Sequence, residues 1–111
     1  MHEQEDDVFG FVLIKCVKGK ENEFCQKLFD MTEAKKCSTD FYDQKSARIA
    51  SVDDVYLIAG GFDVAITLSS TSTRKIEEFA IKYLRSECGD FILDTQTLVG
   101  IKVKSLKSAL Q

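Results

Sequence analysis

Hydrophobic residues occupy both alternate sets of positions along residues 9–17, Phe-Gly-Phe-Val-Leu-Ile-Lys-Cys-Val. A strand that is covered on both faces has this pattern, so the first element is predicted to be a buried strand. Lys18-Gly19-Lys20 then predicts a turn, and Asn22 or a neighbour can cap a helix that ends near Lys36. The core-facing side of this helix is predicted to be Phe24, Cys25, Leu28, Phe29, Met31 and Thr32.

Two further strands are predicted on either side of a double glycine. Residues 55–59 are a compact apolar run, and along residues 62–68 the apolar positions alternate with Asp63, Ala65 and Thr67. Gly60-Gly61 between the two runs is typical of a tight hairpin. Residues 37–51 show neither period, and they are predicted to form a loop with at most one short helical turn.

The second helix has the clearest pattern in the chain. Its apolar residues recur at spacings of three and four, and Gly89 stands where the helix is expected to end. Ser72 or Thr73 is predicted to cap its first turn. The apolar stripe consists of Ile76, Phe79, Ala80, Tyr83 and Leu84. Alternation along residues 97–103 predicts the last strand.

The predicted order of elements is βαββαβ, which defines the fold class. With right-handed crossovers this order gives a ferredoxin-like α+β domain, a four-stranded antiparallel sheet with both helices on one face. The other face is left bare, although the first strand is apolar on both sides. A second copy is predicted to cover it with its own sheet, as in a dimeric α/β barrel.

The dimer interface is predicted to use one alternate set of the first strand. That set is Phe9, Phe11, Leu13 and Val17, and the opposite set is Val12, Ile14 and Cys16. Both sets are apolar, so the pattern does not decide which of them meets the partner.

Composition and charge narrow the classes of function. The 111 residues suffice for one domain, predicted at 9–111 with an insertion at about 37–51, after a disordered acidic tail at 1–8. The net charge is −3 and the basic residues are scattered, which argues against direct binding of nucleic acid. Because no apolar run has the length of a membrane span or a signal peptide, the protein is expected in the cytoplasm.

The cysteines do not form a metal-binding motif. Cys16, Cys25, Cys37 and Cys88 include no CxxC pair, and the one histidine, His2, does not stand at zinc-finger spacing from them. Neither a metal ion nor a cofactor is therefore predicted. Cys16 and Cys25 are expected to be reduced and buried as small apolar groups, whereas Cys37 falls in a stretch where a thiol can be exposed.

Several short motifs are similar in type and order to those of one known family. They are Phe11-Val12-Leu13-Ile14-Lys15 with Lys18-Gly19-Lys20-Glu21, then Gly60-Gly61-Phe62-Asp63, then Thr95-Gln96-Thr97-Leu98-Val99, and the ending from Val103-Lys104 to Ala109-Leu110. Over residues 9–36 and 52–111 the chain resembles the ligand-binding (RAM) domain of the leucine- and asparagine-responsive transcription regulators (Lrp/AsnC). It resembles the stand-alone form of that domain, because no DNA-binding helix-turn-helix precedes the first strand. The segment 37–51 is longer than the family's connection, and Phe62 replaces the family's tyrosine.

The resemblance implies a homodimer that often assembles into tetramers or octamers, with an amino-acid effector near the hairpin. It implies that Gly60 and Gly61 offer backbone groups to the carboxylate of this ligand and that Asp63 meets its ammonium group. Thr95 and Thr97 fall on the stretch that approaches the site in the family. The implied function is amino-acid sensing and oligomerisation that modulates transcription indirectly.

Three other readings of the same residues stay open. The glycines and Asp63 can serve the turn alone, and the threonines are good strand formers without any ligand. The chain is not expected to be an enzyme, but dimeric ferredoxin-like barrels include small enzymes, for which Tyr56, Asp63 and Tyr83 are the remaining candidates. The third reading is an assembly partner of a longer helix-turn-helix paralogue that acts without a ligand.

Overall fold

The computed structural model of this chain describes residues 8–32, 40–42, 45 and 47–101. The predicted acidic tail up to residue 7, Cys37, and the ending from Val103 to Leu110 that forms part of the family resemblance lie outside the described residues. The first helix ends at Met31, because Thr32 already has an extended backbone, and not near Lys36 as predicted.

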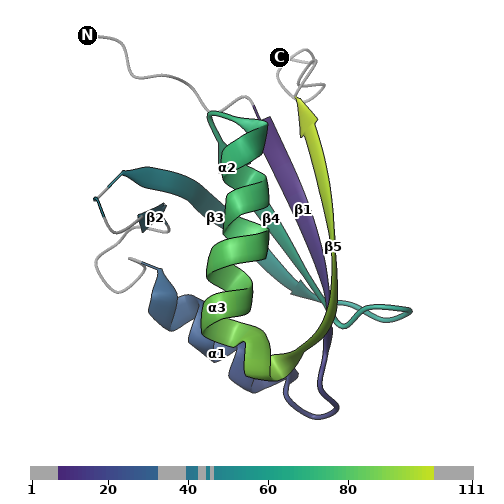
Figure 1. Cartoon of the computed structure of the whole chain (residues 1–111). Helices are drawn as coiled ribbons and strands as arrows, with labels where there is room; N and C mark the ends of the chain where they lie inside the picture. Colours follow the sequence, from purple (N-terminus) through teal and green to yellow (C-terminus); the bar gives the residue numbers. More distant parts are fainter. Residues whose placement is uncertain (1–7, 33–39, 43–44, 46, 102–111) are drawn as a thin grey trace, which may run out of the picture.

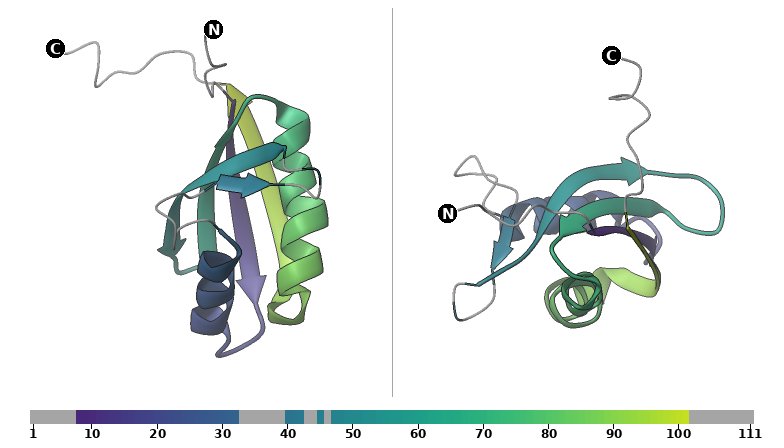
Figure 2. Two further views of the ribbon diagram at one scale, coloured as in Figure 1. Left: turned by 90° about the vertical axis from the view of Figure 1, so that its left-hand side faces the viewer. Right: turned by 90° about the horizontal axis from the view of Figure 1, so that it is seen from above.

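The described elements form one antiparallel sheet with helices on one face (Figure 1). Along the chain they are β1 (Val8–Cys16), α1 (Glu21–Met31), β2 (Asp40–Tyr42), β3 (Arg48–Leu57), β4 (Val64–Ser70), α2 (Thr73–Glu78), α3 (Arg85–Cys88) and β5 (Ile92–Ile101). The strands lie in the order β2-β3-β4-β1-β5, and Figure 2 shows how the sheet twists across this order. The predicted ferredoxin-like fold is therefore confirmed, with one more strand than the four predicted.

The additional strand comes from the segment that the sequence pattern assigns to a loop. β2 pairs with the first half of β3, which itself begins at Arg48 and not at residue 55 as predicted. The Asp40 carboxylate accepts a hydrogen bond from the Arg48 guanidinium over 3.0 Å and another from the Ser51 hydroxyl. These polar contacts, together with the buried ring of Phe41, fix β2 at the edge of the sheet.

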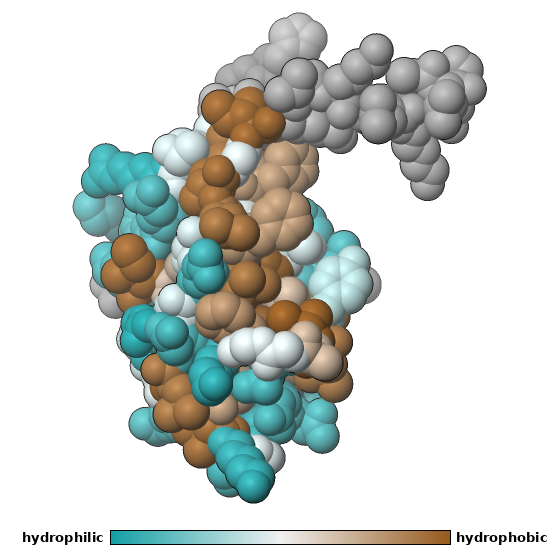
Figure 3. Space-filling view, turned by 90° about the vertical axis from the view of Figure 1, so that its right-hand side faces the viewer, coloured by the Kyte–Doolittle hydropathy of each residue, from teal (hydrophilic) through white to brown (hydrophobic). Residues whose placement is uncertain are grey.

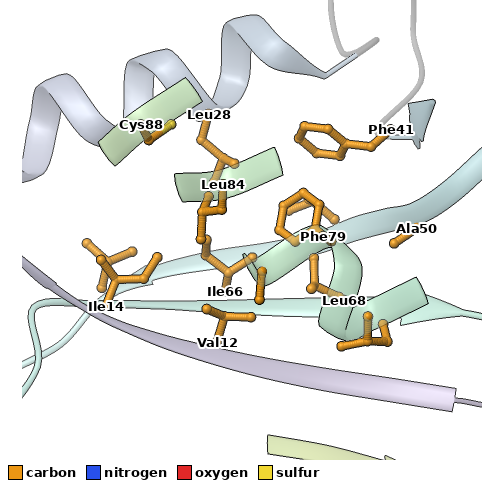
Figure 4. Close-up of a cluster of buried hydrophobic side chains, with 14 of the residues drawn as sticks. Val12, Ile14, Leu28, Phe41, Ala50, Ile66, Leu68, Phe79, Leu84 and Cys88 are labelled. Atoms are coloured by element: carbon orange, nitrogen blue, oxygen red, sulfur yellow. The ribbon is translucent and has the colours of Figure 1, made fainter. Parts of the chain in front are cut away.

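The core lies between the helices and the even-numbered residues of β1. Val12 and Ile14 are fully buried there, and Phe24 and Leu28 of α1 pack in the same cluster. Figure 4 shows side chains from the sheet and from both helices converging in this layer. Because side chains alternate along a strand, the odd-numbered residues of β1 lie on the outer face of the sheet, away from the helices.

The helix predicted from the second stripe runs from Thr73 to Cys88 as α2, a wider π-helical turn over Phe79–Leu84, and α3. Ser72 caps it as predicted, because its hydroxyl accepts a hydrogen bond from the amide of Lys75 over 3.2 Å. Gly89 follows its last residue, also as predicted. The first helix differs from its prediction, because it begins at Glu21 after Lys20 and has no side-chain cap, so Asn22 lies inside its first turn.

The hairpin that joins β3 to β4 is wider than the tight turn predicted for it. β3 ends at Leu57 and β4 begins at Val64, so residues 58–63 all belong to the connection. The amide of Ile58 donates to the carbonyl of Asp63 over 2.9 Å and closes this loop at its base. Gly60 has a φ of +127°, a conformation that side-chain-bearing residues rarely adopt, and this requirement explains a glycine here.

Candidate functional site

The two hairpin glycines lie at the tip of the β3–β4 loop, which extends away from the sheet (Figure 1). Both are exposed, and a Cβ added at either position would meet no atom within 4 Å. Among the described residues, neither glycine amide donates a backbone hydrogen bond outside the strands and helices. These are the amides that the family resemblance assigns to the carboxylate of a ligand.

Asp63 is positioned by the end of β1. Its amide donates to the carbonyl of Ile14 over 2.8 Å, and its Oδ2 accepts a hydrogen bond from the amide of Cys16 over 2.9 Å. β1 pairs with β4 only as far as Ile14, so this carboxylate occupies the place where the next strand partner of Cys16 would stand. The Oδ2 atom of Asp63 therefore has a structural role. Within the described part of the chain, the Oδ1 atom of the same carboxylate accepts no hydrogen bond.

Thr95 and Thr97 lie on the opposite side of β1, in β5. They pair with Ile14 and Val12, so their side chains are on the face of the sheet that the helices cover. The hydroxyl of Thr95 accepts a hydrogen bond from the Arg85 guanidinium over 3.0 Å. Sequence reasoning missed Arg85, whose only signal is a place on the polar side of the second helix.

The five predicted ligand residues are not brought together within one chain. β5 and β4 flank β1 on opposite sides, and two strand spacings amount to roughly 10 Å. The glycines are farther still, because the loop tip extends beyond the end of β1. Asp63 and the glycines thus form one group and the β5 threonines another.

An apolar patch marks the outer face of the sheet. Phe11 of β1 and its direct partner Leu98 of β5 are each 48% exposed, and Phe9 and Leu13 beside them are half-buried. Phe9, Phe11, Gly100 and Ile101 also line a shallow hollow of about 320 Å³. Figure 3, which views the molecule from the β5 side, shows hydrophobic side chains in a band along this flank.

The two alternate sets of β1 residues differ in their burial by the described part of the chain. The even-numbered residues are under the helices, whereas Phe9, Phe11 and Leu13 of the predicted interface lie outside. Val17 follows the strand, and its amide donates to the carbonyl of Phe91 over 2.9 Å. We call Phe9, Phe11, Leu13 and Leu98 the outer patch.

The described cysteines are small groups of the core or its border. Cys16 and Cys88 are buried, as predicted for Cys16, and Cys25 is half-buried. Burial above all, and next the nearby Asp63 carboxylate, raises the pKa of the Cys16 thiol to about 11, and burial raises that of Cys88 to about 11 as well. Both groups are thus poor nucleophiles at neutral pH.

Within the described ranges, no three His, Cys, Asp or Glu side chains gather in a way that would hold a metal ion. In the same part of the chain, none of the helices combines the length and apolar character that crossing a bilayer needs. The tyrosines considered for catalysis lie apart. Tyr56 is on the outer face of β3 opposite Ala65, and Tyr83 packs against the core in the helix layer.

Solved structures with the same fold include transcription regulators. FFRP-DM1 is 22% identical over 85% of this chain and 99% of its own length, with a TM-score of 0.60. AsnC of E. coli is 19% identical over 91% of this chain and 57% of its own, with a TM-score of 0.60. A transcriptional regulator of Neisseria meningitidis, solved in complex with L-Met, is 16% identical over 88% of this chain and 53% of its own, with a TM-score of 0.59. This chain thus spans little more than half of the two regulators.

No family model and no curated protein matches the sequence. At identities of 16–22%, these structures show similarity of fold. The resemblance seen in the sequence motifs is therefore confirmed for the fold. The chain has the fold of the ligand-binding domain of the Lrp/AsnC-type regulators.

Proposed function

We propose that this chain is an amino-acid-sensing and oligomerisation module related to the Lrp/AsnC-type regulators, and that it modulates transcription indirectly through its assembly. The observation that carries the proposal is the outer patch on a sheet of this fold. Phe11 and Leu98 form a directly paired apolar surface on the one face that the described helices do not cover. Exposed apolar patches of this kind are typical of interaction sites.

A second copy suits this surface because an isologous pair of sheets buries the same residues on both partners. The outer patch has polar neighbours on both sides, since Thr67 of β4 stands beside Phe11 and Gln96 of β5 stands beside Leu13. An apolar centre with a polar surround is the usual arrangement of a protein interface. A longer regulator with a helix-turn-helix would offer a matching sheet and is the alternative partner.

The association is tested by measuring the molar mass with light scattering. The wild-type chain is expected at twice its mass of 12.5 kDa or more. Phe11→Glu is expected to raise the dissociation constant about 100-fold or more, because burying an unpaired carboxylate costs about 3 kcal/mol or more. Ile81→Glu is the control, since Ile81 is 70% exposed in the helix layer. A wild-type chain that stays monomeric would contradict the proposal.

The proposed effector site is at the hairpin, with the amides of Gly60 and Gly61 for a carboxylate and Asp63 for an ammonium group. The complex of the Neisseria meningitidis regulator with L-Met supports an amino acid as the class of ligand. Because the β5 threonines are remote from this group within one chain, Thr95 and Thr97 would reach a ligand only from another copy. We therefore expect binding and assembly to depend on each other.

Calorimetric titration with a panel of amino acids tests this site. Asp63→Asn is expected to weaken binding about tenfold, because an amide removes the charge that attracts an ammonium group but keeps an acceptor for the Cys16 amide. Asp54→Asn removes a carboxylate elsewhere on the same hairpin and is expected to leave affinity unchanged. Equal affinity of both variants and the wild type would remove Asp63 from the site.

A further inference from the structure

A hollow of about 480 Å³ opens in the helix layer, on the side where β2 joins the sheet. Its lining residues are Lys27, Asp30, Met31, Phe41, Tyr42, Tyr83 and Glu87. They come from α1, β2 and the second helix, which Figure 2 shows on one side of the molecule. None of them belongs to the hairpin site or to the outer patch.

Helical spacing explains the two longer walls of this hollow. Lys27 and Met31 are four residues apart on α1, with Asp30 beside them, so the three share one face of that helix. Tyr83 and Glu87 are likewise four residues apart on the second helix. The walls therefore present one ammonium group, two carboxylates and a phenol toward the same space.

The third wall is the inserted strand. Phe41 is 5% exposed and its ring packs edge-on against Phe79 in the core, as Figure 4 shows, while Tyr42 is 45% exposed. Both rings line the hollow and make part of its surface aromatic.

The hollow carries charges of both signs, and one of its carboxylates, that of Asp30, accepts a hydrogen bond from the side-chain amide of Gln26 over 3.1 Å. Within the described part of the chain, neither the Lys27 ammonium nor the Glu87 carboxylate forms an ion pair or a hydrogen bond. Lys27 contributes one positive charge, and Asp30 and Glu87 contribute one negative charge each, which leaves a net charge of −1. The last turn of α1 contains no basic residue, so its C-terminal carbonyl dipoles add to the attraction for a cation.

This combination matches a zwitterion with an apolar side chain. A carboxylate would meet Lys27, an ammonium group would meet Glu87, and the apolar part would contact Phe41, Met31 and the tyrosine rings. A volume of about 480 Å³ lies in the range of small-molecule pockets, which is roughly 300–1,000 Å³. A purely anionic or purely apolar ligand would leave charged groups of the walls unmatched.

We propose that this hollow binds an α-amino acid with an apolar or aromatic side chain, held between Lys27 and Glu87 against the inserted strand β2. The site goes beyond the hairpin site proposed above, because it is complete within one chain and does not require association. It also gives the inserted strand a function, since β2 supplies two of the seven lining residues.

Titration with three probes tests the pairing of charges. L-phenylalanine is expected to bind, whereas phenylethylamine, which lacks the carboxylate, and 3-phenylpropionate, which lacks the ammonium group, are each expected to bind about tenfold more weakly or worse. Lys27→Gln and Glu87→Gln are expected to weaken L-phenylalanine about tenfold. The matched controls, Lys82→Gln and Glu77→Gln, replace exposed charges of the second helix that do not line the hollow and should change the affinity less than twofold.

The hairpin variant Asp63→Asn separates this proposal from the preceding one. Loss of L-phenylalanine binding in the Lys27 and Glu87 variants, with Asp63→Asn unaffected, supports the hollow and counts against the hairpin. Loss in Asp63→Asn alone overturns the hollow, and so does the absence of binding for L-phenylalanine, L-leucine and L-methionine alike. Tyr42→Ala provides a second variant that should fold normally, because Tyr42 is largely exposed, and unchanged affinity in it would overturn the role of β2.

Discussion

Replacing Phe79 with alanine is expected to lower the free energy of unfolding by roughly 3–5 kcal/mol, the usual cost of truncating a large buried ring. Phe79 is fully buried in the π-helical turn, and its ring meets that of Phe41 with centroids 4.7 Å apart and planes inclined at 71°. The truncation would thus leave a cavity in the core, and it would also remove the contact between Phe79 and Phe41 that holds β2 against the core. Small domains have roughly 5–15 kcal/mol of stability, so this loss is a large part of the total.

Urea denaturation followed by circular dichroism measures this effect. Ile81→Ala is the control, because Ile81 stands two residues further along the same turn and is 70% exposed, so its truncation should change stability by about 0.5 kcal/mol or less. A double-mutant cycle with Phe41→Leu and Phe79→Leu should give a coupling of about 0.5–1.5 kcal/mol for the aromatic pair. A cost of Phe79→Ala no larger than that of Ile81→Ala would show that β2 and the helix are not packed as described.

The order of elements followed from periodicity because buried side chains recur at the spacing of their own backbone. The stripe that includes Ile76, Phe79 and Leu84 predicted the second helix, and it named every buried residue of that helix except Cys88. The stripe persists through the π-helical turn, which a sequence pattern does not reveal, since it inserts no residue of unusual type. Ser72 and Gly89 marked the ends because their roles depend on local backbone geometry.

The inserted strand could not be predicted because its stability comes from partners distant in sequence. β2 has three residues, too few for any period, and it is held by Arg48, Ser51 and the ring of Phe79. The hollow beside it was missed for the same reason. Its charges stand on α1 and on the second helix, about 60 residues apart, and only the fold places Lys27 and Glu87 around one space.

The candidate site at the hairpin was only partly predictable. Gly60 indicated a backbone position that needs positive φ, and the structure shows one there. The loop length did not follow, because the double glycine alone gives no measure of where the flanking strands stop pairing. The structural role of Asp63 at the end of β1 depends on Cys16, a contact across 47 positions of sequence that no local motif encodes.

Hydrophobicity alone does not predict which face of β1 meets the helices, because both alternate sets of residues are apolar. One glycine of β1 does indicate this face. Gly10 belongs to the even-numbered set, and a Cβ built on it would lie 2.4 Å from Cγ2 of Ile76, a fully buried residue of α2. The missing side chain at residue 10 is therefore what lets α2 approach the sheet on this face. The odd-numbered set has no corresponding gap within β1, and its apolar residues remain outside.

Gly10→Ala is accordingly expected to destabilise the protein by about 1–3 kcal/mol, the usual cost of inserting a carbon into a packed core. Ile76 cannot turn aside easily, because its branched Cβ restricts the side-chain rotamer in a helix. Gly89→Ala is the control in thermal or urea unfolding, since Gly89 has a φ of −57° and open space at its Cβ, and it should be neutral or slightly stabilising.

A second substitution distinguishes a steric clash at Gly10 from a loss of backbone freedom. Ile76→Ala removes the methyl group that the new Cβ would meet, so in that background Gly10→Ala should cost much less than in the wild type, with a coupling of about 1 kcal/mol or more. Strictly additive costs would mean that α2 does not rest on residue 10. The packing of α2 would then no longer be evidence that the odd-numbered residues of β1 lie on the outer face.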